Sequence, residues 1–205
     1  MKTIRTAGFA WMTALALLCI LQAPCAAGDF TPAQMKKMGV FLSNFTELGF
    51  YNVDHRDFDD PLNPEKAIRF GIWHNYTNNY NTRIKHCKQS CPYGSLVIDG
   101  KYVAESVAKY LGFRFDNHRS VKSGYITCHY DGKLYHFEGA DGESNAYARV
   151  REAKQVSAGV IRVRGELYDP DAPSVTMGTF SAEITPAEWK GKDTWHLLNI
   201  SCDRH

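Results

Sequence analysis

The stretch YITCHYDGKLYHFE, residues 125–138, is the part of the sequence that decides the fold. Two segments with alternating apolar and polar residues, Tyr125 to Tyr130 and Lys133 to Glu138, flank the pair Asp131-Gly132. An Asp-Gly pair in this setting is a strong hairpin signal, because glycine accepts the positive φ that a tight turn requires. The stretch therefore predicts two antiparallel strands.

The segments that follow this hairpin keep the same two-residue period. In Val160 to Tyr168, apolar residues alternate with charged ones, which indicates one buried face and one solvated face. The tetrapeptide Thr185-Pro186-Ala187-Glu188 matches a capping box and predicts one turn of helix between the last two strands. The expected strands are Asn145 to Lys154, Val160 to Tyr168, Ser174 to Ile184 and Thr194 to Cys202.

The residues before the hairpin follow helical spacing instead. Thr31-Pro32-Ala33-Gln34 has a capping threonine, a proline at the first helical position and a glutamine that closes a capping box. A second, longer helix is expected from Pro64 to about Ile84, and a third from Val103 to Leu111, ended by Gly112. Helices followed by a run of antiparallel strands are typical of the α+β class.

We expect one curved antiparallel sheet that wraps the N-terminal helices. This order of elements is similar to the cone-shaped layouts of NTF2-like and cystatin-like folds. No internal repeat or low-complexity linker divides the chain, so residues 28–205 are interpreted as a single α+β domain. Such layouts host enzymes and binding proteins alike, so the layout alone assigns no activity.

The first 27 residues have the pattern of a cleaved export signal. Lys2 and Arg5 precede an apolar run from Ala7 to Leu21, and small residues then lead into Gly28. The apolar run is shorter than the roughly 20 residues that span a bilayer. We therefore expect an exported protein, periplasmic or extracellular, with no transmembrane span in the mature chain.

The charge balance argues against nucleic acid as a partner. The whole chain has 24 Lys and Arg against 22 Asp and Glu. The signal segment contains two basic residues, Lys2 and Arg5, and no acidic ones, so the mature chain is close to neutral. It also has no basic block of the kind that binds phosphate backbones.

The cysteines of the mature chain predict disulfides. Cys87, Cys91, Cys128 and Cys202 remain after the signal is removed, an even number in an exported chain. We favour the pairs Cys87–Cys91 and Cys128–Cys202 among the three possible arrangements. A zinc site at His86, Cys87 and Cys91 is the alternative, but thiols persist poorly outside the cytosol, so no metal is expected.

Three stretches resemble exported bacterial proteins of an uncharacterised family. They are Leu42-Ser43-Asn44-Phe45-Thr46-Glu47-Leu48, Phe70-Gly71-Ile72-Trp73-His74-Asn75-Tyr76 and Tyr135-His136-Phe137-Glu138-Gly139-Ala140-Asp141-Gly142-Glu143. The resemblance implies no activity and no catalytic residues.

Two groups of side chains are candidates for ligand binding. On the second helix, His74, Asn75 and Asn78 share adjacent surfaces, so they could orient a polar ligand in a pocket under the sheet. Aromatic side chains on the hairpin could line a concave sheet. For both groups, packing within the core is the competing interpretation. The candidates are Trp73, His74, Asn75, Asn78, Tyr125, His129, Tyr135 and Phe137.

The sequence contains no Gly-x-Ser-x-Gly elbow, His-Glu-x-x-His pair or phosphate-binding loop. The leading hypothesis is therefore an exported, non-catalytic binding or inhibitory domain that needs no cofactor. Its partner would be an envelope protein, a cell-wall fragment or a small molecule. One alternative is a small periplasmic enzyme that uses His74 as an acid–base group, and another is a structural envelope protein that docks a partner.

Overall fold

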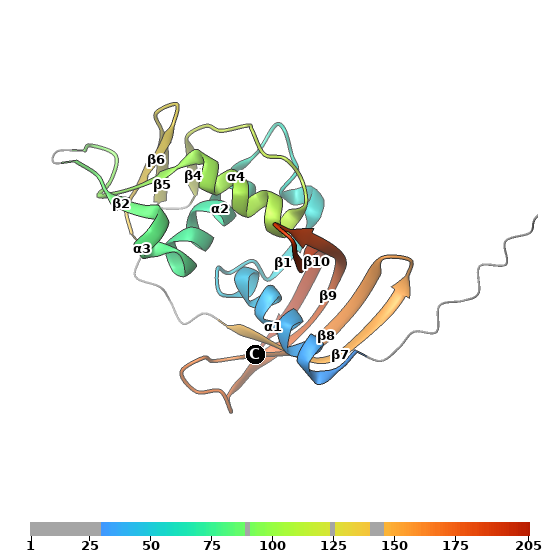
Figure 1. Ribbon diagram of the computed structural model, residues 1–205. Helices are drawn as coiled ribbons and strands as arrows, with labels where there is room; N and C mark the ends of the chain where they lie inside the picture. The colour runs from blue at the N-terminus through green and yellow to red at the C-terminus, as the bar shows by residue number, and fades with distance from the viewer. Residues whose placement is uncertain (1–29, 89–90, 124–125, 140–145) are drawn as a thin grey trace, which may run out of the picture.

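The computed structural model describes residues 30–88, 91–123, 126–139 and 146–205 (Figure 1). The expected export signal, residues 1–27, and the candidate site residue Tyr125 lie outside the described part of the chain. The domain boundary expected at residue 28 therefore stays a prediction. None of the described helices is long and apolar enough to cross a membrane.

Two of the described helices have the capping chemistry that the sequence predicts. The Thr31 hydroxyl accepts a hydrogen bond from the backbone N–H of Gln34, whose side chain bonds back to the Thr31 backbone. Gly112 ends the fourth helix with a φ of 81°, in the left-handed region. The elements are α1 (Pro32–Thr46), the 3-10 turn η1 (His55–Asp57), α2 (Glu65–Asn78), α3 (Tyr80–Arg83) and α4 (Gly100–Leu111).

The second predicted helix is interrupted. It was expected to run to about Ile84, but α2 stops at Asn78 because Asn79 leaves the helical region, with φ −137° and ψ 23°. Asparagine competes for backbone hydrogen bonds and is a weak helix former, so consecutive asparagines favour a break here. Ile84 begins a strand instead and is buried opposite Ile98.

The strands form two five-stranded antiparallel sheets within the described residues. The long sheet has the order β1-β10-β9-β8-β7, and the short sheet has the order β2-β3-β6-β5-β4. The long sheet contains β1 (Asn52–Asp54), β7 (Tyr147–Ser157), β8 (Val160–Tyr168), β9 (Thr176–Trp189) and β10 (Lys192–Arg204). The short sheet contains β2 (Ile84–His86), β3 (Leu96–Asp99), β4 (Val121–Ser123), β5 (Ile126–Tyr130) and β6 (Leu134–Phe137).

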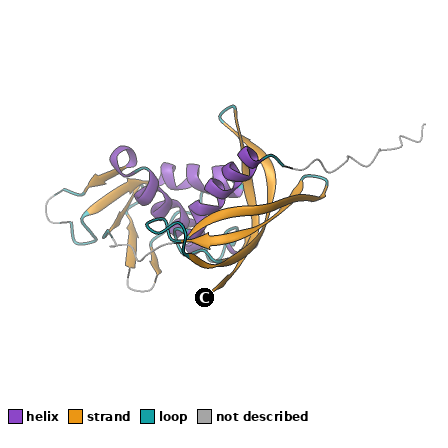
Figure 2. Ribbon diagram, turned by 90° about the horizontal axis from the view of Figure 1, so that it is seen from below, coloured by secondary structure: helices purple, strands orange, loops and turns teal. Residues whose placement is uncertain are grey.

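The α+β class and the curved antiparallel sheet packed on helices are confirmed. The strands divide between two sheets rather than lying in one, and the helices lie between the sheets (Figure 2). Buried side chains from both sheets and from α1, α2 and α4 join one hydrophobic core. The hairpin around Asp131-Gly132 is present, with His129 opposite His136 and Gly132 at a φ of 99°.

The helical turn expected at Thr185-Pro186-Ala187-Glu188 is wrong. β9 continues through these residues to Trp189, and the chain turns at Lys190 and Gly191, which have φ values of 52° and 77°. The register pairs Pro186 with Trp195 of β10, while β8 pairs with β9 only as far as Ile184. One edge of β9 is therefore free at Pro186, which is where a strand tolerates a proline.

Candidate functional site

A cleft lies between α1 and the edge strand β7 of the long sheet. Its volume is about 490 Å³, and we call it the α1–β7 cleft. Aliphatic side chains form part of its wall, and charged, amide and tyrosine side chains form the rest. The lining residues are Pro32, Met35, Lys36, Gly39, Val40, Ser43, Asn44, Glu47, Asn78, Tyr147, Ala148, Arg149, Val150 and Tyr168.

Two small residues on α1 hold the helix close to β7. A Cβ atom at Gly39 would lie 2.8 Å from the carbonyl oxygen of Ala148, so only glycine fits at this approach. The Ser43 hydroxyl donates to the Gly39 carbonyl at 2.9 Å and accepts from the Ala148 backbone N–H at 3.0 Å. These contacts fix the helix against the edge of the sheet and so define one side of the cleft.

A buried carboxylic acid lies in this cleft. Glu47 is only 4% exposed, and its Oε1 accepts a hydrogen bond from the Asn78 side-chain amide at 2.6 Å. The Tyr147 side chain interacts with the same carboxyl group. Burial raises the pKa of Glu47, although hydrogen bonds from Asn78 and Tyr147 act in the opposite direction. Side chains from α2 and β7 therefore hold this carboxyl group within the cleft lining.

His74 lies behind Asn78 rather than in the cleft. Its Nδ1 is 3.4 Å from the Asn78 amide nitrogen, and its ring packs against Phe70 and Tyr110. Burial, followed by the positive charges of Lys109 and Arg83, lowers the pKa of His74 to about 3. The imidazole is therefore neutral near pH 7 and shielded from solvent.

Asn75 connects two helices in the core. It is fully buried, and its amide nitrogen donates to the Gly71 carbonyl at 2.7 Å and to the Ser106 hydroxyl at 2.9 Å. Its side-chain oxygen accepts from Arg83 at 3.0 Å. These bonds satisfy the amide within the protein and tie α2 to α4, so packing rather than ligand contact explains this residue.

The aromatic candidates on the hairpin also pack into the core. Phe137 and Tyr135 are fully buried, and neither lines the α1–β7 cleft. Trp73 packs edge-on against Phe137 at 5.7 Å between ring centroids, and the Tyr135 hydroxyl bonds to His118. His129 lies on the opposite face of the hairpin, stacked on Tyr93.

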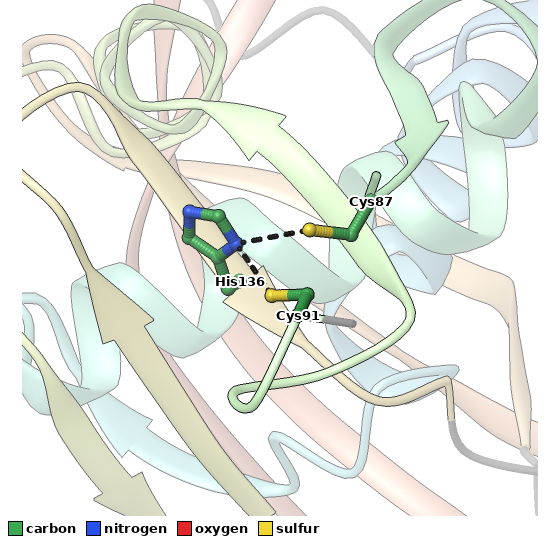
Figure 3. A group of neighbouring side chains, drawn as sticks. All are labelled: Cys87, Cys91 and His136. Atoms are coloured by element: carbon green, nitrogen blue, oxygen red, sulfur yellow. Dashed lines mark hydrogen bonds between the residues drawn. The ribbon is translucent and has the colours of Figure 1, made fainter. Parts of the chain in front are cut away.

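Two thiols and an imidazole meet beside the short sheet, on the face turned away from the core, and we call them the Cys87–Cys91–His136 cluster (Figure 3). The Nδ1 atom of His136 lies 3.5 Å from the Sγ of Cys87 and 3.2 Å from the Sγ of Cys91. Both cysteines come from the segment between β2 and β3, and His136 comes from β6. Residues distant in the sequence therefore converge here.

Asp131 orients the imidazole of this cluster. Its Oδ2 lies 2.9 Å from the Nε2 of His136, while its Oδ1 accepts from the backbone N–H groups of Lys133 and Leu134. These hydrogen bonds, led by the one from His136, lower the pKa of Asp131 to about 2. The turn that joins β5 to β6 thus positions a charged carboxylate behind the ring.

The thiols of the cluster are electrostatically unequal. A hydrogen bond between them raises the pKa of Cys87 and lowers the pKa of Cys91, and the backbone of Tyr93 lowers the latter further. Burial acts to lower the pKa of His136, but hydrogen bonds to Asp131 and Cys91 outweigh it and raise the value. A hydrogen bond from His136 also acts to lower the pKa of Cys91, which favours the thiolate form.

All four cysteines of the described chain are free thiols in the structure. Cys87 and Cys91 are close enough to share His136, so the pairing expected between them remains a proposal. Cys128 is buried in β5 of the short sheet, whereas Cys202 lies in β10 of the long sheet. Burial raises the pKa of both these thiols to about 12, which makes them poor nucleophiles.

The sequence analysis did not identify Glu47 in the α1–β7 cleft or His136 in the Cys87–Cys91–His136 cluster. Glu47 follows the apolar stripe of α1, and a carboxylate four residues after the buried Ser43 was the available signal. His136 alternates with Tyr135 and Phe137, so it had to face away from the core. Of the expected candidates, Asn78 lines the cleft and His129 lies beside the cluster, with its ring centroid 6.1 Å from that of His136.

No family model, no curated protein and no solved structure matches this chain. The resemblances drawn from the sequence therefore stay predictions.

Proposed function

We propose that the chain is an exported, non-catalytic binding domain whose ligand occupies the α1–β7 cleft. The observation that carries this proposal is the buried Glu47 carboxyl in a cleft that also presents aliphatic side chains. Export is part of the proposal because of the signal pattern in residues 1–27.

The size and lining of the cleft favour a small molecule. Ligand pockets usually enclose about 300–1,000 Å³ and combine apolar walls with a few polar groups. A volume of about 490 Å³ falls in this range. Met35, Val40 and Val150 offer apolar contact, while the carboxyl of Glu47 accepts a hydrogen bond. The ligand class that fits is a small amphipathic molecule with a hydroxyl or amine group.

The geometry gives less support to an enzyme that uses His74. A general base must reach the proton that it removes, but His74 is 4% exposed and lies behind Asn78. With its pKa lowered to about 3, it also stays unprotonated at the pH where most enzymes work. Glu47 and Asn78 can orient a ligand through hydrogen bonds without any proton transfer.

The proposal is tested by filling the cleft from a solvent-exposed position. Val40 is 63% exposed at the rim, so Val40→Trp places an indole there without disturbing the core. We expect the wild-type protein to bind the amphipathic dye anilinonaphthalene sulfonate at one site. We expect Val40→Trp to weaken this binding by roughly tenfold or more, because lost apolar contact of this size is worth more than 1.4 kcal/mol.

Val156→Trp is the matched control, because this valine is 40% exposed at the far end of β7 and does not line the cleft. It should bind the dye as the wild type does. Glu47→Gln, which keeps the shape of the side chain, should alter the pH dependence of binding. Equal dye affinity in Val40→Trp and the wild type would show that the cleft is not the binding site.

A further inference from the structure

The geometry points to a metal site at the Cys87–Cys91–His136 cluster, with two thiolates and one imidazole as ligands for a zinc-class divalent ion. This site is separate from the α1–β7 cleft, since it belongs to the short sheet and shares no lining residue with the cleft. The inference does not depend on the ligand of the cleft, but it replaces the disulfide expected between Cys87 and Cys91, because two sulfurs joined in a disulfide cannot bind an ion as thiolates.

The distances within the cluster match those between ligands of one ion. Zinc binds thiolate sulfur at about 2.3 Å and imidazole nitrogen at about 2.0 Å with tetrahedral angles, which sets ligand sulfur and nitrogen about 3.5 Å apart. The Nδ1 of His136 lies 3.5 Å and 3.2 Å from the two sulfurs. All three ligand atoms lie within 4.8 Å of one another. The three donor atoms are therefore spaced like the ligands of one zinc-class ion.

Asp131 supplies a second, independent observation. Ligand histidines usually donate their other ring N–H to a carboxylate, which fixes the tautomer and turns the free nitrogen toward the metal. The bond from His136 Nε2 to Asp131 Oδ2, at 2.9 Å, has this arrangement. It leaves Nδ1 with a lone pair that faces Cys87 and Cys91 (Figure 3).

The donor set selects the class of ion. Two soft sulfurs and one imidazole suit zinc, and they disfavour magnesium and calcium, which prefer oxygen ligands. Cys87 and Cys91 also line a hollow of about 330 Å³ together with His86, Ser95 and Glu138. Water from this hollow can complete the tetrahedron.

His136, not His86, is the ligand that the fold provides. His86 precedes Cys87 in the sequence but is exposed and lies outside the group of converging ligand atoms. His136 is 49 residues from Cys87, yet β3 pairs with β6 so that Val97 lies opposite His136. This pairing places the imidazole of His136 beside the segment between β2 and β3, which contains both cysteines.

The experiment titrates the reduced, untagged full-length chain with Co²⁺ and then with Zn²⁺ in the absence of oxygen. We expect one Co²⁺ per chain, with thiolate charge-transfer absorption and the visible bands of tetrahedral cobalt. Zn²⁺ should displace cobalt stoichiometrically. Binding should also release protons, since the thiols must deprotonate to become ligands.

The variants distinguish ligands from neighbours. His136→Asn should abolish one-to-one binding, and Asp131→Asn should weaken Zn²⁺ binding about 10–100-fold through the loss of orientation. His86→Asn is the matched control and should bind Co²⁺ like the wild type. Circular dichroism of each metal-free variant verifies folding. His136 faces away from the core, so its replacement should leave the spectrum unchanged.

Three outcomes would overturn the inference. The first is that the reduced, folded wild type takes up no Co²⁺ or Zn²⁺. The second is that His86→Asn loses binding while His136→Asn keeps it. The third is that peptide mapping without reductant finds a Cys87–Cys91 disulfide in most molecules even when Zn²⁺ was supplied in excess during expression.

Discussion

The long sheet and the short sheet are held together in different ways. In the long sheet, β9 spans 14 residues and pairs with β8 on one side and β10 on the other. In the short sheet, β5 is 5 residues long and β2 only 3. Long strands make many cross-strand side-chain pairs, whereas short strands make few, so the short sheet relies more on its contacts with the helices. The long sheet contributes one wall of the α1–β7 cleft, and the short sheet holds the Cys87–Cys91–His136 cluster.

Removing an aromatic side chain from the short sheet should have the largest effect. Phe137 is fully buried and packs against Trp73 and Tyr76. Phe137→Ala should lower the free energy of unfolding by about 3–5 kcal/mol, because a cavity replaces these contacts. Urea denaturation measures the loss, and hydrogen exchange should quicken first in β3, β5 and β6.

Leu197→Ala is the corresponding change in the long sheet, at another fully buried position. It should cost about 2–5 kcal/mol. Its hydrogen exchange should quicken in β9 and β10 and stay slow in the short sheet. If both variants quickened hydrogen exchange equally in both sheets, the two sheets would unfold as one cooperative unit. That result would contradict the difference between the sheets.

Acid should destabilise the helical layer through His74. Its pKa is lowered from 6.5 to about 3 in the folded protein, so between these values the unfolded chain binds a proton that the folded chain does not. The contribution of neutral His74 to the free energy of unfolding is therefore fully present above pH 6.5 and is lost as the pH falls toward 3. At pH 4 the loss should be roughly 3 kcal/mol.

His74→Gln should remove this part of the acid sensitivity in urea titrations at pH 7 and pH 4. The exposed His86 of the short sheet provides the control, and His86→Gln should leave the acid-induced loss in place. An unchanged difference between the two pH values in His74→Gln would contradict the assignment to buried His74.

The close approach of α1 to β7 should be sensitive to a single methyl group. Gly39→Ala places a Cβ 2.8 Å from the backbone oxygen of Ala148, so the helix must move away. We expect a loss of about 1–3 kcal/mol in stability. Val40→Ala, at the next and exposed position, should stay within about 0.5 kcal/mol of the wild type. A stability gain in Gly39→Ala, as helix propensity alone predicts, would contradict this packing.

The sequence predicts features that depend on neighbouring residues. The capping box at Thr31, the left-handed Gly112 and the hairpin at Asp131-Gly132 follow from local chemistry and are confirmed. The helical turn at Thr185-Pro186-Ala187-Glu188 failed because pairing with β10 outweighs a local capping signal. Tertiary pairing, rather than local propensity, decided this segment.

The candidate site was less predictable because its residues converge only in the folded chain. Asn78 was identified from helical spacing, but its partner Glu47 comes from another helix. His86 was weighed as a zinc ligand because it adjoins Cys87, whereas the imidazole that reaches the thiols belongs to His136. Spacing along the sequence cannot tell which histidine lies nearer the thiols, because strand pairing brings the distant His136 closer than the adjacent His86.

The pairing of β1 with β10 sets the order in which the long sheet can be completed. Asn52 lies opposite Ser201, and the Asn52 side chain accepts from the backbone N–H of Cys202. β10 also separates β1 from β9, so β1 cannot join the long sheet until residues 192–204 have been synthesised. Contacts this far apart in sequence slow folding. A chain shortened before β10 would therefore leave β1 without its partner strand.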